Sequence, residues 1–234
     1  MEKHIILLVE GICEISAFEV AFKKVGNTQI LMELMEGDPL TDHARMHEPP
    51  KKIIGSMLSR IKREKGLRDS DISFVALLTD TDGAFVGEED VIVDGHVADA
   101  DQKEYEDDAI RVTTASKRSA IIRRNELKKD RLNSLVRDNL IAGCDFSVYY
   151  FSCNLDHVLH GIAEFARYEK EDFATGFAQK HDTVAKLWDF FSDESVAVRG
   201  TYEQTWEYIG KDENSLERGS NFHLLLERII KGHP

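Results

Sequence analysis

Leu77-Leu78-Thr79-Asp80-Thr81-Asp82-Gly83 decides the fold, because it places two carboxylates one residue apart at the end of an apolar run. A second apolar run, Ile5-Ile6-Leu7-Leu8-Val9, ends in Glu10. Continuous apolar runs of this length are typical of strands that are buried on both faces of a parallel sheet. The carboxyl ends of parallel strands meet at one edge, where open α/β sheets bind ligands. We therefore expect Glu10, Asp80 and Asp82 to face one crevice.

Carboxylates that share a crevice repel one another. Two like charges about 4 Å apart cost about 4 kcal/mol at an effective dielectric near 20. The cluster therefore needs a cation or a shared proton. Asp-x-Asp at a strand end supplies the hard oxygen ligands that Mg²⁺ takes, and the turn at Gly83 lets the backbone approach an ion. Our hypothesis is a divalent metal ion, Mg²⁺ or Mn²⁺.

The remaining periodicity predicts an α/β fold with a mostly parallel sheet of about four strands flanked by helices, followed by an all-helical extension. The predicted strands cover residues 3–9, 29–35, 72–78 and 146–151, and the first two helices cover 14–24 and 50–64. The metal-binding domain is expected at 1–152 and the helical extension at 153–234. In the extension we predict helices at 154–167, 170–179, 182–191, 201–209 and 219–231, docked on the sheet without a flexible tether.

Two charged segments interrupt this pattern. Residues 83–108 carry ten acids against one lysine, and we expect a loop or irregular insertion at about 83–110. Residues 111–137 then carry nine Lys plus Arg against two acids, which predicts a basic helix at about 117–138. This helix presents either a solvated face or a track for nucleic acid. The candidates for phosphate contacts are Lys117, Arg118, Arg123 and Arg124.

The composition limits the class of protein. The 234 residues include 30 Lys plus Arg and 43 Asp plus Glu, and the net charge of −13 argues against a generally basic surface that coats nucleic acid. We find neither a run of about 18 apolar residues nor a signal peptide, so we expect a cytoplasmic protein without a membrane span. The three cysteines lack CxxC spacing, which predicts neither a disulfide framework nor a zinc site.

Two motifs together, Val9-Glu10-Gly11-x-x-Glu14 before a helix and Asp80-x-Asp82-Gly83 after a strand, resemble the Toprim domain of topoisomerases, primases and OLD-type nucleases. The resemblance covers about residues 3–152. It implies that Glu10 acts as a general acid/base or metal-site residue and that Asp80 and Asp82 hold Mg²⁺. It also implies that Glu14 serves a second metal ion. The implied function is a metal-dependent nuclease that cleaves RNA or DNA, as an anti-phage effector of bacterial defence.

A further stretch, Phe151–His157, follows the fourth predicted strand. Together with Tyr168-x-Lys170 it loosely resembles RloB-like Toprim proteins, while the simpler interpretation is that Asn154 or Asp156 caps the next helix. His43 and His47 have a spacing that can bind zinc on a helix, but no third ligand lies nearby in the sequence.

Two other functions remain open at this point. The stretch at Asp80 also resembles the nucleophile loop of haloacid-dehalogenase-like phosphatases, in which the first Asp attacks phosphate. That interpretation leaves Glu10 unexplained. The second is a non-catalytic Toprim-like subunit that acts with a partner ATPase, since this chain has no GxxxxGK[ST] motif. The C-terminal helices are candidates for homodimer or partner contacts.

Overall fold

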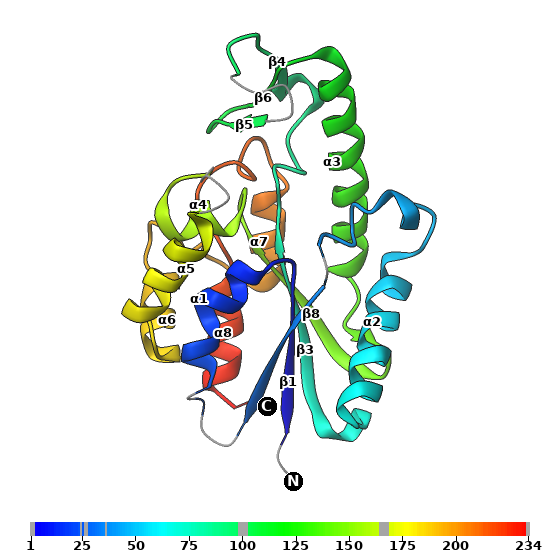
Figure 1. Ribbon diagram of the computed structural model, residues 1–234, viewed down its shortest axis with the longest axis vertical. Helices are drawn as coiled ribbons and strands as arrows, with labels where there is room; N and C mark the ends of the chain where they lie inside the picture. Colours follow the sequence, from blue (N-terminus) through cyan, green and yellow to red (C-terminus); the bar gives the residue numbers. More distant parts are fainter. Residues whose placement is uncertain are drawn as a thin grey trace.

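The computed structural model describes residues 3–23, 25, 28–35, 37–97, 103–163 and 169–232. The chain is an α/β protein whose five-stranded, mostly parallel sheet is flanked by helices on both faces (Figure 1). None of the helices within these ranges is long and apolar enough to cross a membrane.

The central sheet has the strand order β2-β1-β3-β8-β7. Its strands are β1 (His4–Val9), β2 (Gln29–Leu34), β3 (Ile72–Asp80), β7 (Leu140–Ile141) and β8 (Cys144–Phe151). The first three and β8 pair in parallel, which confirms the four predicted strands, whereas β7 pairs antiparallel with β8. A strand of two residues is too short to produce a periodic signal, so the sequence pattern missed β7.

Alternate residues of each central strand enter two separate cores, as expected for a sheet that is covered on both faces. Ile5, Leu7 and Val9 face a core with α1 (Ile12–Phe22) and with four helices of the C-terminal part, α4 (Leu155–His160), α5 (Lys170–Lys180), α6 (Val184–Phe191) and α8 (Phe222–Ile230). Ile6 and Leu8 face a core with α2 (Pro50–Lys65), α3 (Ala115–Leu135) and α7 (Tyr202–Ile209). Short 3-10 turns connect the elements: η1 (His43–Arg45), η2 (Asp69–Asp71) and η3 (Glu88–Asp90).

The C-terminal helices complete the core of the sheet. They are α4 (Leu155–His160), α5 (Lys170–Lys180), α6 (Val184–Phe191), α7 (Tyr202–Ile209) and α8 (Phe222–Ile230). Phe18 of α1 stacks on Phe222 of α8 with ring centroids 4.9 Å apart, so the two predicted parts of the chain share one core. The helix predicted at 154–167 ends at His160, because Gly161 adopts a left-handed φ of 72°. Residues 164–167 of that prediction lie outside the described residues.

Side chains from α7 and from the start of α8 cover the edge of β8 beyond β7. The hydroxyl of Tyr202 accepts a hydrogen bond from Val148 N at 3.0 Å, and Asn221 Oδ1 accepts one from Tyr150 N at 2.9 Å. The Trp206 indole donates to Val148 O. These groups satisfy backbone donors and acceptors that an open edge would expose, and they fix the C-terminal helices on the sheet.

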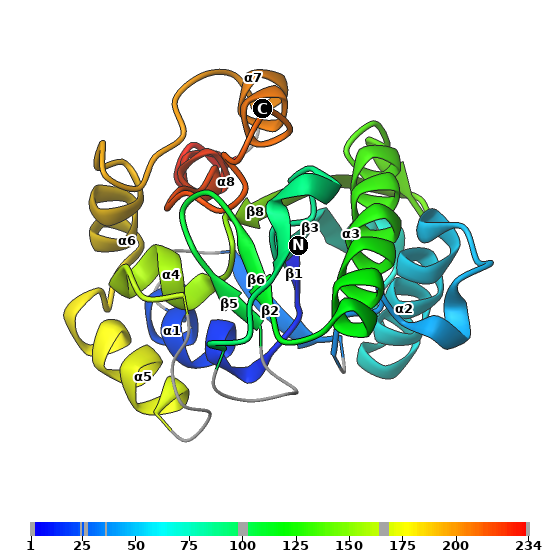
Figure 2. The ribbon, with the colours of Figure 1, turned by 90° about the horizontal axis from the view of Figure 1, so that it is seen from above.

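The segment expected as an irregular insertion forms a second, three-stranded sheet, which corrects that prediction. Its strands are β4 (Val91–Val93), β5 (Lys103–Tyr105) and β6 (Ile110–Val112), in the order β4-β6-β5. The strands have three residues each, too few for a clear alternation, but their buried side chains form a small core with Ile121 and Leu216. Figure 1 shows the small sheet above the carboxyl edge of the main sheet, and in Figure 2, which is seen from above, it lies in front of the main sheet.

The predicted basic helix is α3 (Ala115–Leu135), which begins at an N-cap made by Thr114. The helix starts two residues before the first residue of the predicted range, 117, and ends three residues before its last residue, 138. Its buried positions include apolar side chains and also Asn125, Lys128 and Arg131. These three polar side chains of α3 are therefore buried, and Lys128 lies at the carboxyl edge of the sheet.

Candidate metal centre

Carboxylates follow three neighbouring strands at the upper edge of the sheet. Glu10 follows β1 directly, Asp38 lies in the turn after β2, and Asp80 ends β3 two residues before Asp82. Because β1 lies between β2 and β3, the ends of all three strands are adjacent. This is the edge at which open parallel sheets bind ligands.

Glu10, Asp38 and Asp82 form a carboxylate triad. Their ligand atoms lie within 4.8 Å of one another, and among the described residues this is the one group of His, Cys, Asp and Glu that could hold a metal ion. The predicted members Glu10 and Asp82 are thus brought together. Asp38 was missed, although its place in the Gly37-Asp38-Pro39 turn after a predicted strand was a usable signal.

The ammonium group of Lys128, from α3, lies among the triad. Its Nζ is 2.9 Å from Asp82 Oδ2, 3.0 Å from Asp38 Oδ2 and 3.5 Å from Glu10 Oε1, and its side chain is 0% exposed. Burial disfavours the charged form, but the three carboxylates hold the pKa of Lys128 well above its ordinary value. Burial also raises the pKa of Glu10, against the attraction of Lys128.

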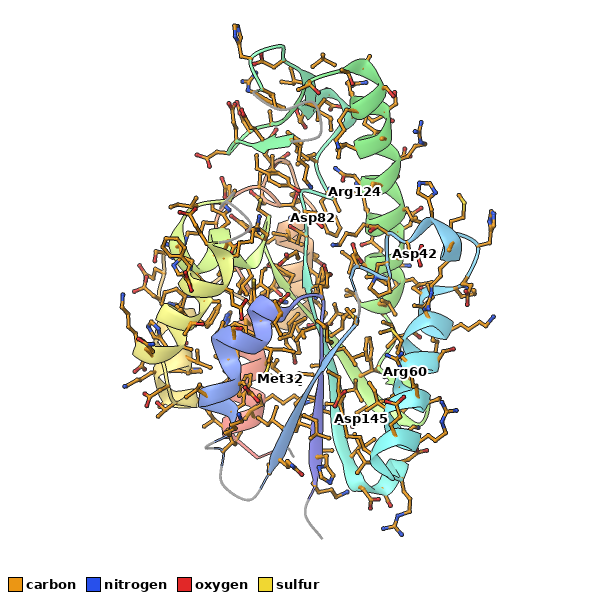
Figure 3. The ribbon with its side chains drawn as sticks, viewed as in Figure 1. Met32, Asp42, Arg60, Asp82, Arg124 and Asp145 are labelled. Carbon is orange, nitrogen blue, oxygen red and sulfur yellow. The ribbon has the colours of Figure 1, made fainter. Side chains whose placement is uncertain are left out.

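Asp82 is the most heavily contacted carboxylate of the triad. Its Oδ1 accepts a hydrogen bond from Tyr105 OH at 3.1 Å and lies 3.5 Å from Lys103 Nζ and 3.7 Å from Arg124 Nη1. Figure 3 shows Arg124 beside Asp82, and the same guanidinium donates to Asp82 O at 2.8 Å. Burial raises the pKa of Asp82, but Lys128, Lys103 and Arg124 outweigh it and hold that pKa well below its ordinary value.

The backbone of Asp82 adopts a positive φ of 53°, and Gly83 follows with a φ of 66°. Asp82 N donates to Cys153 O at 2.7 Å, and Cys153 N donates to the Thr81 hydroxyl at 2.8 Å. These bonds tie the turn after β3 to the turn after β8. The strained conformation of Asp82 is therefore held from both sides, which fixes its carboxylate in the crevice.

The other two predicted ligands, Asp80 and Glu14, lie beside the triad without belonging to it. Asp80 Oδ1 accepts a hydrogen bond from Leu155 N at 2.9 Å, and burial together with Glu14 and Asp82 raises its pKa well above the ordinary value. Glu14 Oε2 accepts from Gly11 N at 3.2 Å. Burial, with smaller contributions from Glu10 and Asp156, raises the pKa of Glu14 to about 8.

The four predicted phosphate contacts have different surroundings. Arg124 contacts Asp82, as described, and Arg118 donates to Val91 O and Glu88 O, which anchors α3 to the small sheet. Lys117 is half-buried at the first turn of α3, and Arg123 is exposed. Arg118 and Arg124 thus contact the protein itself.

The stretch after β8 contains a helix cap and an ion pair. Asn154 is the N-cap of α4 and accepts from His157 N at 2.9 Å, which agrees with the capping interpretation. Asp156 pairs with Lys170 at 2.7 Å. Tyr168, part of the resemblance to RloB-like proteins, lies outside the described residues.

Comparisons of the chain with protein-family models, with curated proteins and with solved structures find no match.

Proposed function

We propose that this protein is a Mg²⁺- or Mn²⁺-dependent nuclease that hydrolyses phosphodiester bonds in RNA or DNA. The observation that carries the proposal is the carboxylate triad at the ends of three adjacent strands, with Lys103, Arg124 and Lys128 around it. Carboxylates attract a hard divalent cation, and the neighbouring cations attract phosphate. The resemblance of the Glu10 and Asp80-x-Asp82 motifs to the Toprim domain supports the same reaction.

The donor set fits the proposed ion. All three groups of the triad are carboxylates, the ligands that Mg²⁺ and Mn²⁺ take in preference to nitrogen or sulfur. Glu10, Asp38 and Asp82 would hold the ion, which when bound supplies charge neutralisation at the scissile phosphate. Arg124 and Lys103 lie beside Asp82 Oδ1, whereas Lys128 contacts Oδ2, so Arg124 and Lys103 would orient Asp82 as a ligand and keep positive charge at the crevice.

The position of Asp80 bears on the phosphatase alternative. A nucleophilic aspartate must be ionised and free to attack phosphorus. One oxygen of Asp80 accepts from the backbone of Leu155, and burial raises the pKa of Asp80 well above its ordinary value. Both features favour a positioning role for Asp80 over a nucleophilic one.

We further propose that the protein acts in the cytoplasm, as an effector of bacterial anti-phage defence. An ATPase partner would supply any nucleotide-driven control. A metal-binding subunit that is inactive alone is the second candidate. It is favoured by Lys128, whose ammonium group closes the triad.

The test is cleavage of a panel of single- and double-stranded RNA and DNA by the purified chain, with Mg²⁺, with Mn²⁺ and with EDTA. Cleavage should need the metal and should disappear in Glu10→Ala and in Asp82→Asn. Asp108→Asn, which changes an exposed acid of the small sheet region, is the matched control and should remain active. Metal-independent cleavage, or cleavage that survives in both triad variants, would refute the proposal. Metal binding without cleavage, alone or with an ATPase partner, would favour the second candidate.

A further inference from the structure

The position of Lys128 conflicts with the position of a metal ion. Its Nζ is 2.9 to 3.5 Å from the same three carboxylates that are arranged to hold a cation. An ion with oxygen ligands at roughly 2 to 2.6 Å would lie in the same small volume. Two cations at such a separation repel strongly when buried, so the triad has room for one of them.

We propose that Lys128 is the built-in cation of the carboxylate triad and that a divalent metal ion must displace its ammonium group to bind. This inference rests on the proposed metal site and adds the step by which the site is opened. The displaced ammonium group enters the crevice that Arg124 and Lys103 already face. Metal binding thereby increases the positive charge that is available there for a phosphate.

The triad is held in place without Lys128, because each carboxylate has a second partner. Asp38 accepts from Leu40 N and from the Thr41 hydroxyl, both at 2.9 Å. The Thr79 hydroxyl donates to Glu10 Oε1.

Asp82 Oδ1 accepts from Tyr105 OH, while Lys128 contacts the other oxygen, Oδ2. When Lys128 leaves, these second contacts remain. The three carboxylates then stay oriented toward the position that the metal ion takes.

Charge neutralisation explains why a lysine lies there. Buried carboxylates without a counter-charge destabilise a fold, and removal of one partner of a buried ion pair typically costs several kcal/mol. Lys128 stabilises the metal-free protein for this reason, and it opposes metal binding for the same reason. A metal ion that binds the folded state must replace this interaction, so its apparent affinity is lower than the carboxylates alone would give.

The experiment compares Mn²⁺ binding by isothermal titration calorimetry in the wild-type protein, in Lys128→Met and in Lys129→Met. Lys129 is the next residue of α3 and lies outside the triad, so it serves as the matched control. We expect Lys128→Met to bind Mn²⁺ at least about tenfold more tightly than the wild type, since no ion pairs have to be broken. Without metal its melting temperature should fall, and Mn²⁺ should raise it by more than in the other two proteins.

Equal or weaker Mn²⁺ binding in Lys128→Met would overturn the inference and leave the proposed metal site standing. Absence of Mn²⁺ binding in all three proteins would overturn both. Tighter binding in Lys128→Met, together with a wild-type protein that cleaves none of the RNA and DNA panel with Mn²⁺, alone or with an ATPase partner, would support the inference and refute the nuclease.

A second measurement does not depend on whether the variant folds. Wild-type crystals are compared with and without Mn²⁺, with the ion located by anomalous scattering. We expect the Mn²⁺ peak among Glu10, Asp38 and Asp82, with Lys128 Nζ moved out of contact with all three. A peak elsewhere, or a Lys128 that keeps its contacts beside a bound ion, would overturn the inference.

Discussion

The side chain of Glu14 makes folding stability depend on pH. It is only 3% exposed, on the face of α1 that lies toward Glu10 and Asp156. Burial is the largest cause that raises the pKa of Glu14 from 4.5 to about 8, and the like charges of Glu10 and Asp156 add to it. Glu14→Gln removes the ionisable group and keeps an oxygen that can accept the hydrogen bond from Gly11 N.

The sign and the size of this change in the free energy of unfolding follow from proton linkage. Below pH 4.5 Glu14 is protonated in both the folded and the unfolded state, and its contribution to stability is fully present. As the pH rises toward 8 the unfolded state releases the proton and the folded state retains it, so the protein loses stability. The difference between 4.5 and about 8, at about 1.4 kcal/mol per pKa unit, gives about 5 kcal/mol in total. Between about pH 5.5 and pH 8 the loss is about 3 kcal/mol.

The assay is urea unfolding in EDTA near pH 5.5 and near pH 8, followed by circular dichroism. The free energy of unfolding of the wild type, relative to Glu14→Gln, should fall by about 3 kcal/mol between the two values. Glu19→Gln is the matched control on the same helix, because Glu19 is exposed and forms a surface pair with Lys23. If the difference between wild type and Glu14→Gln stays within about 0.5 kcal/mol at both pH values, the reasoning about Glu14 is wrong.

Three further predictions concern the triad and the frame around it. Asp38→Asn should abolish Mn²⁺ binding measured by calorimetry, whereas Asp42→Asn in the same loop should bind like the wild type. Tyr202→Phe leaves the buried Val148 N without an acceptor and should lower the free energy of unfolding by about 1 to 3 kcal/mol in urea. Gly83→Ala adds a methyl group at a φ of 66° and within 2.8 Å of two side-chain carbons, and should cost about 1 to 3 kcal/mol.

The last two predictions have matched controls. Tyr208→Phe removes an exposed hydroxyl that contacts Glu217, and Gly95→Ala adds a methyl group that has no atom of the described residues within 4 Å, apart from its chain neighbours. Both should change the free energy of unfolding by less than about 0.5 kcal/mol. Equal effects in each variant and its control would contradict the assignment of these contacts.

The sheet was predictable because its strands are buried on both faces. Continuous apolar runs such as Ile5–Val9 and Ile72–Leu78 have few structural alternatives, and their polar ends identify the carboxyl edge. The order of the strands was not encoded locally. Asp38 shares the crevice only because β2 lies beside β1, so the sequence supplied two members of the triad and the topology supplied the third.

The small sheet shows a different limit. Each of its strands has three residues, and acid-rich segments separate the strands, so the local pattern resembles a loop. Its stability comes from contacts with α3, which follows β6 closely, and with Leu216, which lies far away in the sequence. The same contacts bring Lys103 and Tyr105 to Asp82, and no motif marks either residue.

The sequence does mark Lys128, because this lysine falls within the apolar stripe of α3. Ile121, Asn125, Lys128, Leu132 and Leu135 recur at three- and four-residue spacing and form the buried stripe of α3. In a helix with six other basic residues, one more lysine resembles part of a solvated face. A lysine inside an apolar stripe is different, because a buried ammonium group is stable only beside a buried counter-charge. Such a lysine therefore predicts an acidic cluster elsewhere in the chain, and Glu10 and Asp82 were already identified as acids that needed a cation.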